Sequence, residues 1–563
     1  MKLIISWFKF KHKVNAVIVL LLCITLPSLS QGWQWARQVG TCQYHSSVWG
    51  GVITDGANLY LMGDYNDSLY TQTDTLIPNG RNDMYIIKYD SEGNELWVKG
   101  FGGCNMWGEL DWERPEYVSG VYDHNCNCIY LSGKFYNTMQ LSPSITISGD
   151  DGFDHIFLAK MDLDGYFQWA KRLDTIKSAY PFLEEIQSNF ASVYSEADGD
   201  IFLAGNIRDT SAIDTVKINP GGFFARYDSQ GNCKWVSHKF SGFSAGALRI
   251  DNTNSDIIMA GFFYQLSATI DTANLELSGL QDAYLARMDS MGNVRWVKKT
   301  GGKGEAAFYD LVVDSYGNIY TAGYFRDTIS IDSLVLSNPE EDLLLCKFDE
   351  NGNLLWAKQG FSTGETELID ICLISDGGIY ITGYFSGTVS FGNNLISTLK
   401  ESEMFLARYD ENGNCSGVKH FGNAYSYSII TDNNGNPVCA GKFTGTITIG
   451  NDELNSNEAY FVYVAKSDSI SGIHEFQNKS EEQLVIYANP TAGTCNIVIP
   501  DDFQFDNNLT LSIYDNRARL IRQILVKISN NEIKFNIEAE AKGIYNIILS
   551  NNKKQYFGKL IFE

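Results

Sequence analysis

Residues 283–302 read AYLARMDSMGNVRWVKKTGG, and residues 312–325 read VVDSYGNIYTAGYF. Both segments alternate apolar with polar positions, are rich in β-branched and aromatic residues, and contain a short Asp-x-x-Gly-Asn turn. This pattern is typical of antiparallel strands joined by tight turns. Trp296 of the first segment and Gly323 of the second have counterparts throughout the chain, so the fold follows from how often the two segments return.

The first segment recurs every 60 to 72 residues, and its last copy has glycine in place of tryptophan. A glycine that ends an apolar strand, and an aspartate that ends another, recur in the same order and the same number. A repeat of this length, built of short strands, indicates β-propeller blades, here seven. The anchors are Trp35, Trp97, Trp169, Trp235, Trp296, Trp356 and Gly417; the glycines Gly63, Gly133, Gly205, Gly261, Gly323, Gly383 and Gly441; and the aspartates Asp90, Asp162, Asp228, Asp289, Asp349, Asp410 and Asp468.

The order of the segments predicts how the ring closes. The Trp35 segment comes first in the chain, and no tryptophan segment follows Asp468. We therefore expect the N-terminal strand to complete the last blade, which makes residues 31–470 an all-β, seven-bladed propeller closed by its N-terminal strand.

The Asp-x-x-Gly-Asn segments are predicted to be hairpin turns. The aspartate can cap its own turn, and the glycine supplies the positive φ that a bulged hairpin needs. Asp432-Asn433-Asn434-Gly435-Asn436 comes nearest to a calcium loop, so calcium is kept as an alternative at these turns. No other cofactor is expected, and the scattered histidines give no metal-binding spacing.

These repeats resemble the bacterial seven-bladed propeller repeat family over residues 31 to about 470. The resemblance implies the propeller fold and a location outside the cytoplasm. It carries no catalytic residues.

Residues 1–30 read as a signal peptide. Four lysines precede the apolar run VIVLLLCITL, and Ser28-Leu29-Ser30 offers small residues at a cleavage site. An uncleaved anchor is the alternative, but the run is shorter than the roughly 20 residues that span a bilayer. We expect no stable transmembrane segment after removal of the leader.

Net charge narrows the range of partners. Removing the four lysines of the leader takes the formal charge from −24 to −28. Such a surface repels nucleic acid, so nucleic acid is not an expected partner. In an oxidising compartment the cysteines can form disulfides, and Cys104 is predicted to pair with Cys126 or Cys128.

The C-terminal part begins after a polar linker at residues 471–482. Residues 483–563 alternate like the strands of a small antiparallel, immunoglobulin-like β-sandwich. They resemble the sorting domain of type IX secretion in Gram-negative bacteria, through Asn489, Pro490, Gly493, Gly543, Tyr545 and Lys559. This implies the type IX machinery as a partner and a secreted or cell-surface location; an ordinary accessory domain is the alternative.

Candidate ligand residues lie where the chain departs from the repeat. The long segment GGCNMWGELDWERPEY holds indoles, carboxylates and an arginine that suit a sugar ring, although its tryptophans can equally pack the loop onto its blade. Two glutamates are expected in comparable loops of later blades. The candidates are Trp107, Trp112, Glu113, Arg114, Glu305 and Glu367.

Two functions remain open from the sequence. One is a non-enzymatic module that binds a glycan or a protein; the other is a carbohydrate-active hydrolase or lyase that uses carboxylates at the channel mouth. The Gly-x-Ser-x-Gly match at residues 242–246 is read as part of a blade rather than as a nucleophile turn. No catalytic residue and no metal ligand are assigned.

Overall fold

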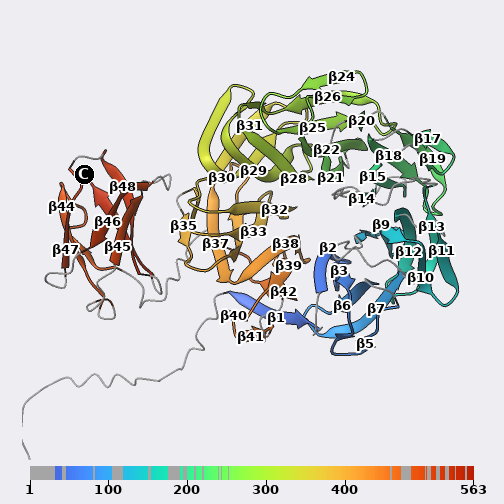
Figure 1. Ribbon diagram of the computed structural model, residues 1–563, viewed down its shortest axis with the longest axis horizontal. Coiled ribbons are helices and arrows are strands. Elements are labelled where there is room, and N and C mark those ends of the chain that lie inside the picture. Colours follow the sequence, from blue (N-terminus) through green and yellow to red (C-terminus); the bar gives the residue numbers. More distant parts are fainter. Residues whose placement is uncertain are drawn as a thin grey trace, which may run out of the picture.

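The computed structural model describes two parts of the chain, and every element from β1 to β49 in them is a strand (Figure 1). The described residues are 32–470 and 484–563, apart from 41–45, 80–82, 104–117, 150–153, 175–190, 195–198, 208–210, 219–220, 239, 242–243, 252, 393, 457–459, 501–502, 504–508, 515–519, 527–531, 539–540 and 552–554. No helix in the described residues is long and apolar enough to cross a membrane.

Seven sheets of the described residues contain the same antiparallel four-strand path. Starting from the strand nearest the centre of Figure 1, the paths are β2 (Ser46–Thr54), β3 (Leu59–Tyr65), β6 (Asp83–Tyr89), β7 (Glu95–Gly103); β8 (Val118–Asp123), β9 (Cys128–Tyr136), β12 (Asp154–Asp162), β13 (Phe167–Arg172); β14 (Ala191–Tyr194), β15 (Ile201–Ile207), β18 (Gly221–Tyr227), β19 (Cys233–Ser237); β21 (Ser244–Asp251), β22 (Asp256–Phe263), β25 (Asp282–Met288), β26 (Val294–Lys299); β28 (Glu305–Val313), β29 (Ile319–Ile331), β30 (Leu334–Phe348), β31 (Leu354–Gly360); β32 (Thr366–Leu373), β33 (Ile379–Phe385), β36 (Glu403–Tyr409), β37 (Cys415–Gly422); and β38 (Ala424–Thr431), β39 (Pro437–Phe443), β42 (Phe461–Ser467), β1 (Trp33–Val39).

The last path joins the two ends of this part of the chain. β1 pairs antiparallel with β42, with Ala36 opposite Ala465 and Val39 opposite Val462. The first strand in sequence is therefore the outer strand of the sheet that ends the repeat array.

Short strands extend the loops between the second and third strands of the sheets. They are β4 (Leu69–Tyr70), β5 (Thr75–Leu76), β10 (Thr138–Ser142), β11 (Ile145–Ser148), β16 (Ser211–Ile213), β17 (Val216–Ile218), β23 (Ser267–Ile270), β24 (Ala273–Glu276), β34 (Thr388–Phe391), β35 (Asn394–Ser397), β40 (Thr446–Ile449) and β41 (Asp452–Asn455), with β20 (Phe240–Ser241) and β27 (Gly301–Gly302) paired beside β23 and β29.

The repeated tryptophan packs each sheet against a turn of the next. A Cβ added at Gly352, in the turn before β31, would lie 2.9 Å from Trp296 Cζ3 of the preceding sheet. Trp296 Nε1 donates to the carbonyl of Glu350 in the same turn at 3.1 Å. The same ring–glycine contact joins Trp35 to Gly93, Trp97 to Gly165, Trp169 to Gly231, Trp235 to Gly292 and Trp356 to Gly413, and the hydrogen bond to the turn is also made by Trp35 and Trp356. The glycine is thus required by the indole as well as by its own positive φ.

The missing tryptophan at Gly417 has a structural counterpart. The turn that it would cover does not exist, because β42 and β1 of the neighbouring sheet are not consecutive in the chain and are not joined by a hairpin. A Cβ at Gly417 would lie 2.7 Å from Ile470 Cγ2, and Arg408 donates to the Ile470 carbonyl at 2.7 Å. Ile470 therefore fills this place.

The Asp-x-x-Gly-Asn turns have the predicted capping. Asp289 Oδ1 accepts from the backbone N–H of Met291 and of Asn293, both at 2.9 Å, and Oδ2 accepts from the Asn293 side chain at 3.0 Å. Gly292 has a φ of 76°. Burial raises the pKa of Asp289, but the hydrogen bonds from Asn293 and Met291 outweigh it, so the pKa is lowered overall.

The first strands of neighbouring sheets contact one another in series: β2 with β8, β8 with β14, β14 with β21, β21 with β28, β28 with β32, β32 with β38, and β38 with β2. Buried and half-buried side chains link them. Arg249 donates to Asp310 at 2.8 Å, Asp310 accepts from the Ile371 N–H at 3.3 Å, and Asp370 accepts from the Ile429 N–H at 2.7 Å. These bonds satisfy N–H groups that have no ladder partner between sheets.

The C-terminal part has two sheets around one apolar cluster. The first contains β43 (Ile486–Tyr487), β44 (Thr494–Val498) and β47 (Glu532–Asn536), and the second β46 (Leu520–Val526), β45 (Leu509–Tyr514), β48 (Gly543–Ser550) and β49 (Gln555–Phe562). Ile497 and Leu511, one from each sheet, are fully buried in this cluster.

Candidate functional site

The residue that follows the repeat glycine occupies one equivalent position in neighbouring sheets. Tyr324 pairs with Ala307, Tyr384 with Glu367, and Lys442 with Tyr425. Residues directly opposite in an antiparallel pair have their side chains on the same face of the sheet. Three successive sheets thus present these side chains at one end, opposite the end that holds the Asp-x-x-Gly-Asn turns.

Tyrosines gather at this position. The Tyr309 and Tyr324 rings are 5.6 Å apart, and the Tyr384 and Tyr425 rings of neighbouring sheets meet edge-on at 4.7 Å. Tyr309 and Tyr427 both occupy β-bulges, which leave one residue unpaired. All five tyrosines are half-buried, so part of each residue remains exposed to solvent.

Four glutamates lie among the tyrosines with one arginine. Arg326 donates to Glu341 at 3.0 Å and approaches Glu305 at 3.8 Å. Burial, with the charge of Glu367, raises the pKa of Glu341 to about 7 in spite of Arg326; Glu365 and Glu305 add smaller contributions. The site therefore holds a carboxyl group that is half-protonated near neutral pH.

Glu367 is held by a tyrosine. Burial raises its pKa, while a hydrogen bond from the Tyr384 hydroxyl opposes that rise. Burial, and then the nearby Glu367 charge, raise the pKa of Tyr384, so its hydroxyl stays a donor. The pair is a neutral donor beside a carboxylate, a common arrangement for binding hydroxyl or amine groups.

Lys442 completes the site from the next sheet. Its Nζ lies 4.9 Å from the Tyr425 ring centre, 5.4 Å from Tyr427 and 4.9 Å from Tyr460. Burial lowers its pKa. No ion pair of Lys442 is found among the described residues, so tyrosine faces are the contacts seen for its ammonium group.

The structure brings together two of the six residues predicted from the sequence. Glu305 and Glu367 both belong to this site, but the prediction that they lie in loops is wrong. Glu305 begins β28 and Glu367 is the second residue of β32, because the innermost strands continue to the end of the sheet. Trp107, Trp112, Glu113 and Arg114 lie outside the described residues.

Sequence reasoning missed the tyrosines, Glu341 and Lys442. A signal was present: the residue after the repeat glycine varies widely in type among the sheets, whereas the residue after that is aromatic in all but one. It is Asp64, Lys134, Asn206, Phe262, Tyr324, Tyr384 and Lys442 in turn. Glu341 had no such signal, because it lies within β30, a 15-residue strand longer than its counterparts.

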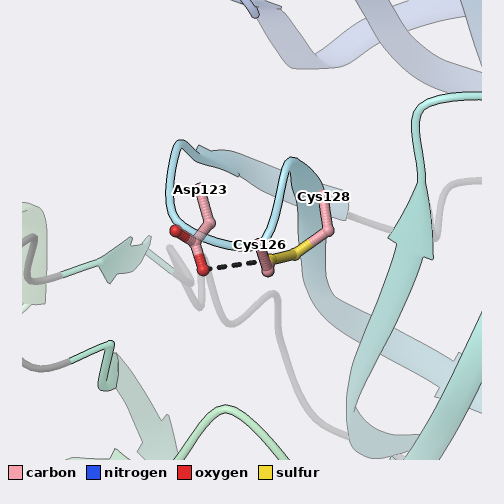
Figure 2. A group of neighbouring side chains, drawn as sticks. All are labelled: Asp123, Cys126 and Cys128. Atoms are coloured by element: carbon pink, nitrogen blue, oxygen red, sulfur yellow. Dashed lines mark hydrogen bonds between the residues drawn. A yellow bond between two sulfur atoms is a disulfide. The ribbon is translucent and has the colours of Figure 1, made fainter.

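A second group of ligand-type side chains lies in the turn between β8 and β9. Figure 2 shows Asp123, Cys126 and Cys128, whose ligand atoms are within 4.8 Å of one another. Cys126 and Cys128 form a disulfide with a Cα–Cα distance of 5.3 Å, so the predicted pairing of either with Cys104 is wrong. The four-residue turn, with Asn127 at φ 51°, brings the two sulfurs together. Bonded to each other, they are not thiolate ligands.

The remaining sequence motifs have structural explanations. Ser244 starts β21 and pairs with Phe262, so it lies in a strand and not in a strand-to-helix elbow. A Cβ at Gly246 would lie 2.3 Å from the Phe308 carbonyl oxygen, which requires glycine there. Asp432 accepts from its own turn and pairs with Lys466 at 2.8 Å, at the edge of a cavity of about 190 Å³. The Asp432–Lys466 pair neutralises the charge at that cavity.

The residues of the sorting motif fix the opening turn of the C-terminal part to its last strand. The Asn489 side chain donates to the Lys559 carbonyl at 2.6 Å and accepts from the Ile561 N–H at 2.8 Å. Pro490 follows Asn489, and a Cβ at Gly493 would lie 2.3 Å from Glu538. Tyr545 is buried and donates to the Ala541 carbonyl, two residues before Gly543. The motif residues thus connect one strand with a turn rather than forming a pocket.

Comparisons with known proteins bear on both parts. Residues 485–563 match the family described as secretion system C-terminal sorting domain. An uncharacterized WD repeat-containing protein, L264 of Acanthamoeba polyphaga mimivirus, is 23% identical over 393 residues, which is 61% of this chain and 24% of the relative. The chain thus spans about a quarter of that relative's length.

Solved structures similar to this chain include the Neurospora crassa Pan2 WD40 domain, with 10% identity and a TM-score of 0.39, covering 78% of this chain and 98% of that one. The Dos1 propeller has 10% identity and a TM-score of 0.35, covering 76% and 95%. Endo-1,5-alpha-L-arabinanase from Thermotoga petrophila has 10% identity and a TM-score of 0.24, covering 76% and 99%.

The family match and the repeated sheets settle two predictions. The C-terminal part is a sorting domain of type IX secretion, so the protein is secreted or displayed at the cell surface and has the type IX machinery as a partner. The repeat array is a β-propeller, and the all-β prediction is confirmed for the described residues.

Proposed function

We propose that residues 31–470 form a closed propeller of seven blades, delivered by a signal peptide at 1–30 and followed by a linker at 471–482 and an immunoglobulin-like β-sandwich at 483–563. The pairing of β1 with β42 supports closure. The series of tryptophan contacts supports it too, since Trp35 of the last sheet packs on Gly93 of the first. At the turns, the aspartate oxygens accept hydrogen bonds from the turn itself, as at Asp289, and calcium stays the alternative there.

The propeller acts as a binding module outside the cell, and its ligand is a glycan. The observation that carries this proposal is the Glu367–Tyr384 pair beside Glu341, within a group of half-buried tyrosines at one end of the propeller. Tyrosine faces stack on sugar rings, and carboxylates and hydroxyls bond sugar hydroxyls. Propellers carry function at such ends, where side chains from several blades meet. A protein ligand remains the other form of this proposal.

The tryptophan-rich segment belongs to the same proposal. β8 begins at the same end of the propeller as β28 and β32, since the first strands of the sheets are equivalent. We therefore keep Trp107, Trp112, Glu113 and Arg114 as ligand-binding candidates on the strength of their sequence, alongside Glu305 and Glu367.

The test is binding of the purified full chain to an array of polysaccharides. Tyr384→Ala removes a central ring and should weaken binding about tenfold or more, the effect of losing one anchoring aromatic. Tyr316→Ala is the matched control, because Tyr316 is 82% exposed and lies in a turn at the opposite end. No retention on any polysaccharide, or equal loss with both variants, would contradict the proposal.

A second candidate function is cleavage of the bound glycan. It is favoured by the raised pKa of Glu341, since an acid that is half-protonated near pH 7 is suited to general acid catalysis. Glu367 would be the carboxylate of such a pair. Release of reducing ends or unsaturated products in the same wells, abolished by Glu341→Gln, would establish an enzyme; retention without product leaves the binding module.

A further inference from the structure

Two neighbouring sheets hold different side chains at the same pair of positions, and the difference between them indicates which chemical group the site would bind. In the sheet of β38 and β39, the residue after the repeat glycine is Lys442, opposite Tyr425. Its ammonium group lies over three tyrosine rings at 4.9 to 5.4 Å. This position of the fold therefore already holds an ammonium group by cation–π contacts.

In the preceding sheet the same pair of positions holds Tyr384 opposite Glu367. This pair also contains one aromatic ring, but the ring lies on the second strand, in the place of Lys442, and a carboxylate takes the place of Tyr425. An ammonium group placed here would meet a ring face and a negative charge together, which is a stronger combination than the one that holds Lys442.

The charges of this sheet and the one before it are unbalanced. Arg326 is the cation that pairs with this group in the described residues, and it contacts Glu341 and Glu305 rather than Glu367. Glu367 has a hydrogen bond from the neutral Tyr384 hydroxyl. A cation bound beside Glu367 would offset the mutual repulsion of Glu341 and Glu367, which raises the pKa of Glu341.

A group of carboxylates alone would be no more than a solvated acidic surface. What distinguishes this group is that its carboxylates are partly buried against tyrosines: the Glu341 side chain is 16% exposed, and Tyr324 and Tyr384 are half-buried. Tyr324 is positioned by Gln281, whose Nε2 donates to its hydroxyl at 3.1 Å. Because the carboxylates are partly desolvated and the rings are held in place, an ammonium group would interact more strongly here than on an open surface.

We propose that the group of side chains formed by Glu367, Tyr384, Tyr324 and Glu341 binds a protonated amine, carried by an amino sugar of the glycan ligand. The proposal rests on the proposed glycan binding and names its chemistry: a hexosamine whose nitrogen is not acetylated. The amine lies between Glu367 and the Tyr384 ring, and Tyr324 with Gln281 offers hydrogen bonds to the sugar hydroxyls.

The experiment compares two probes on the full chain at pH 6.5 by isothermal titration: a glucosamine hexamer without acetyl groups, and the same hexamer fully N-acetylated. The expected result is an affinity for the free-amine hexamer about tenfold or more above that for the acetylated one, because acetylation removes the positive charge and with it the charge-assisted hydrogen bond to Glu367. Equal affinity for the two hexamers would overturn the amine proposal and leave glycan binding in place.

Two variants distinguish the role of Glu367 from the effect of a negative charge elsewhere on the protein. Glu367→Gln keeps the shape and removes the charge, so it should abolish the preference for the free amine. Glu453→Gln removes the same charge from an exposed position on the β40–β41 hairpin and should leave the preference unchanged. An equal effect of both variants would overturn the proposal.

A lysine-rich peptide is the last probe of the experiment, and it tests whether the amine belongs to a protein instead of a glycan. If it binds and neither hexamer does, the amine belongs to a protein, and both the amino-sugar proposal and the glycan proposal fall. Binding of neutral polysaccharides alone, lost with Tyr384→Ala, would remove the amine proposal while supporting the proposed function.

Discussion

The two ends of the propeller use their sequence in opposite ways. At one end, the turns around Gly352 and Gly413 repeat the same aspartate, glycine and asparagine, and each packs on the tryptophan of the preceding sheet. At the other end, the equivalent positions hold Tyr324, Tyr384 and Lys442, and no two sheets agree in both members of the pair. Repetition marks residues that every blade needs in order to pack, and departure from it marks residues free to serve a ligand.

The largest expected effect tests the repeated end. Gly352→Val should lower the free energy of unfolding by about 3 kcal/mol, because valine must adopt a φ of 75° and its Cβ would lie 2.9 Å from Trp296. Gly377→Val is the control: its φ is 85°, but nothing lies within 4 Å, so only backbone strain of about 1 to 2 kcal/mol remains. Thermal or denaturant unfolding measures both. Equal losses would show that the tryptophan contact adds nothing to the glycine requirement.

The next effect tests the variable end and has the opposite sign. Glu341→Gln should stabilise the protein by about 1.5 kcal/mol at pH 8, after allowance for solvent screening. The folded state raises the pKa of Glu341 from 4.5 to about 7, so it favours the protonated form. The stabilisation that comes from the protonated form of Glu341 is complete below pH 4.5 and is lost as the pH rises to about 7. Above that pH the folded protein holds an ionised carboxylate that burial disfavours.

Unfolding free energies of the wild type and of Glu341→Gln, measured from pH 4 to pH 8, check this. The two curves should converge at low pH and separate above pH 7. Parallel curves would mean that Glu341 behaves as an ordinary surface carboxylate, and that its ionised form does not destabilise the free protein in a way that a bound ligand could relieve.

The contrast between the ends also explains what the sequence could predict. Trp296, Gly352 and Asp349 meet a physical demand that recurs at six junctions between sheets, so their spacing revealed the strands, the turns and their order. Gly417 looked like a loss from the pattern, yet it follows from the absence of a turn beside it. That absence depends on how β1 pairs with β42, which the spacing of the repeats does not reveal.

The site was predictable only in part. Glu305 and Glu367 were identified by residue type, but their place on β28 and β32 depends on how far the innermost strands extend. Tyr384 and Lys442 escaped notice because the residue after the glycine was treated as part of the strand motif. Its importance appears only when the register shows which side chains of neighbouring sheets share an end.

The smallest effect returns to the repeated end and concerns acid. Asp289→Ala should cost about 1 kcal/mol at pH 7, because the N–H groups of Met291 and Asn293 lose their acceptor. The folded state lowers the pKa of Asp289, so the contribution of its carboxylate is present above its unfolded pKa, near 3.8, and is lost as pH falls below that value. The difference between wild type and variant should therefore shrink below pH 3.8, whereas the effect of Gly352→Val should not. A difference that stays constant down to pH 2.5 would mean that the side chain supports the turn by packing, and that the hydrogen bonds of the aspartate are not what the repeat preserves.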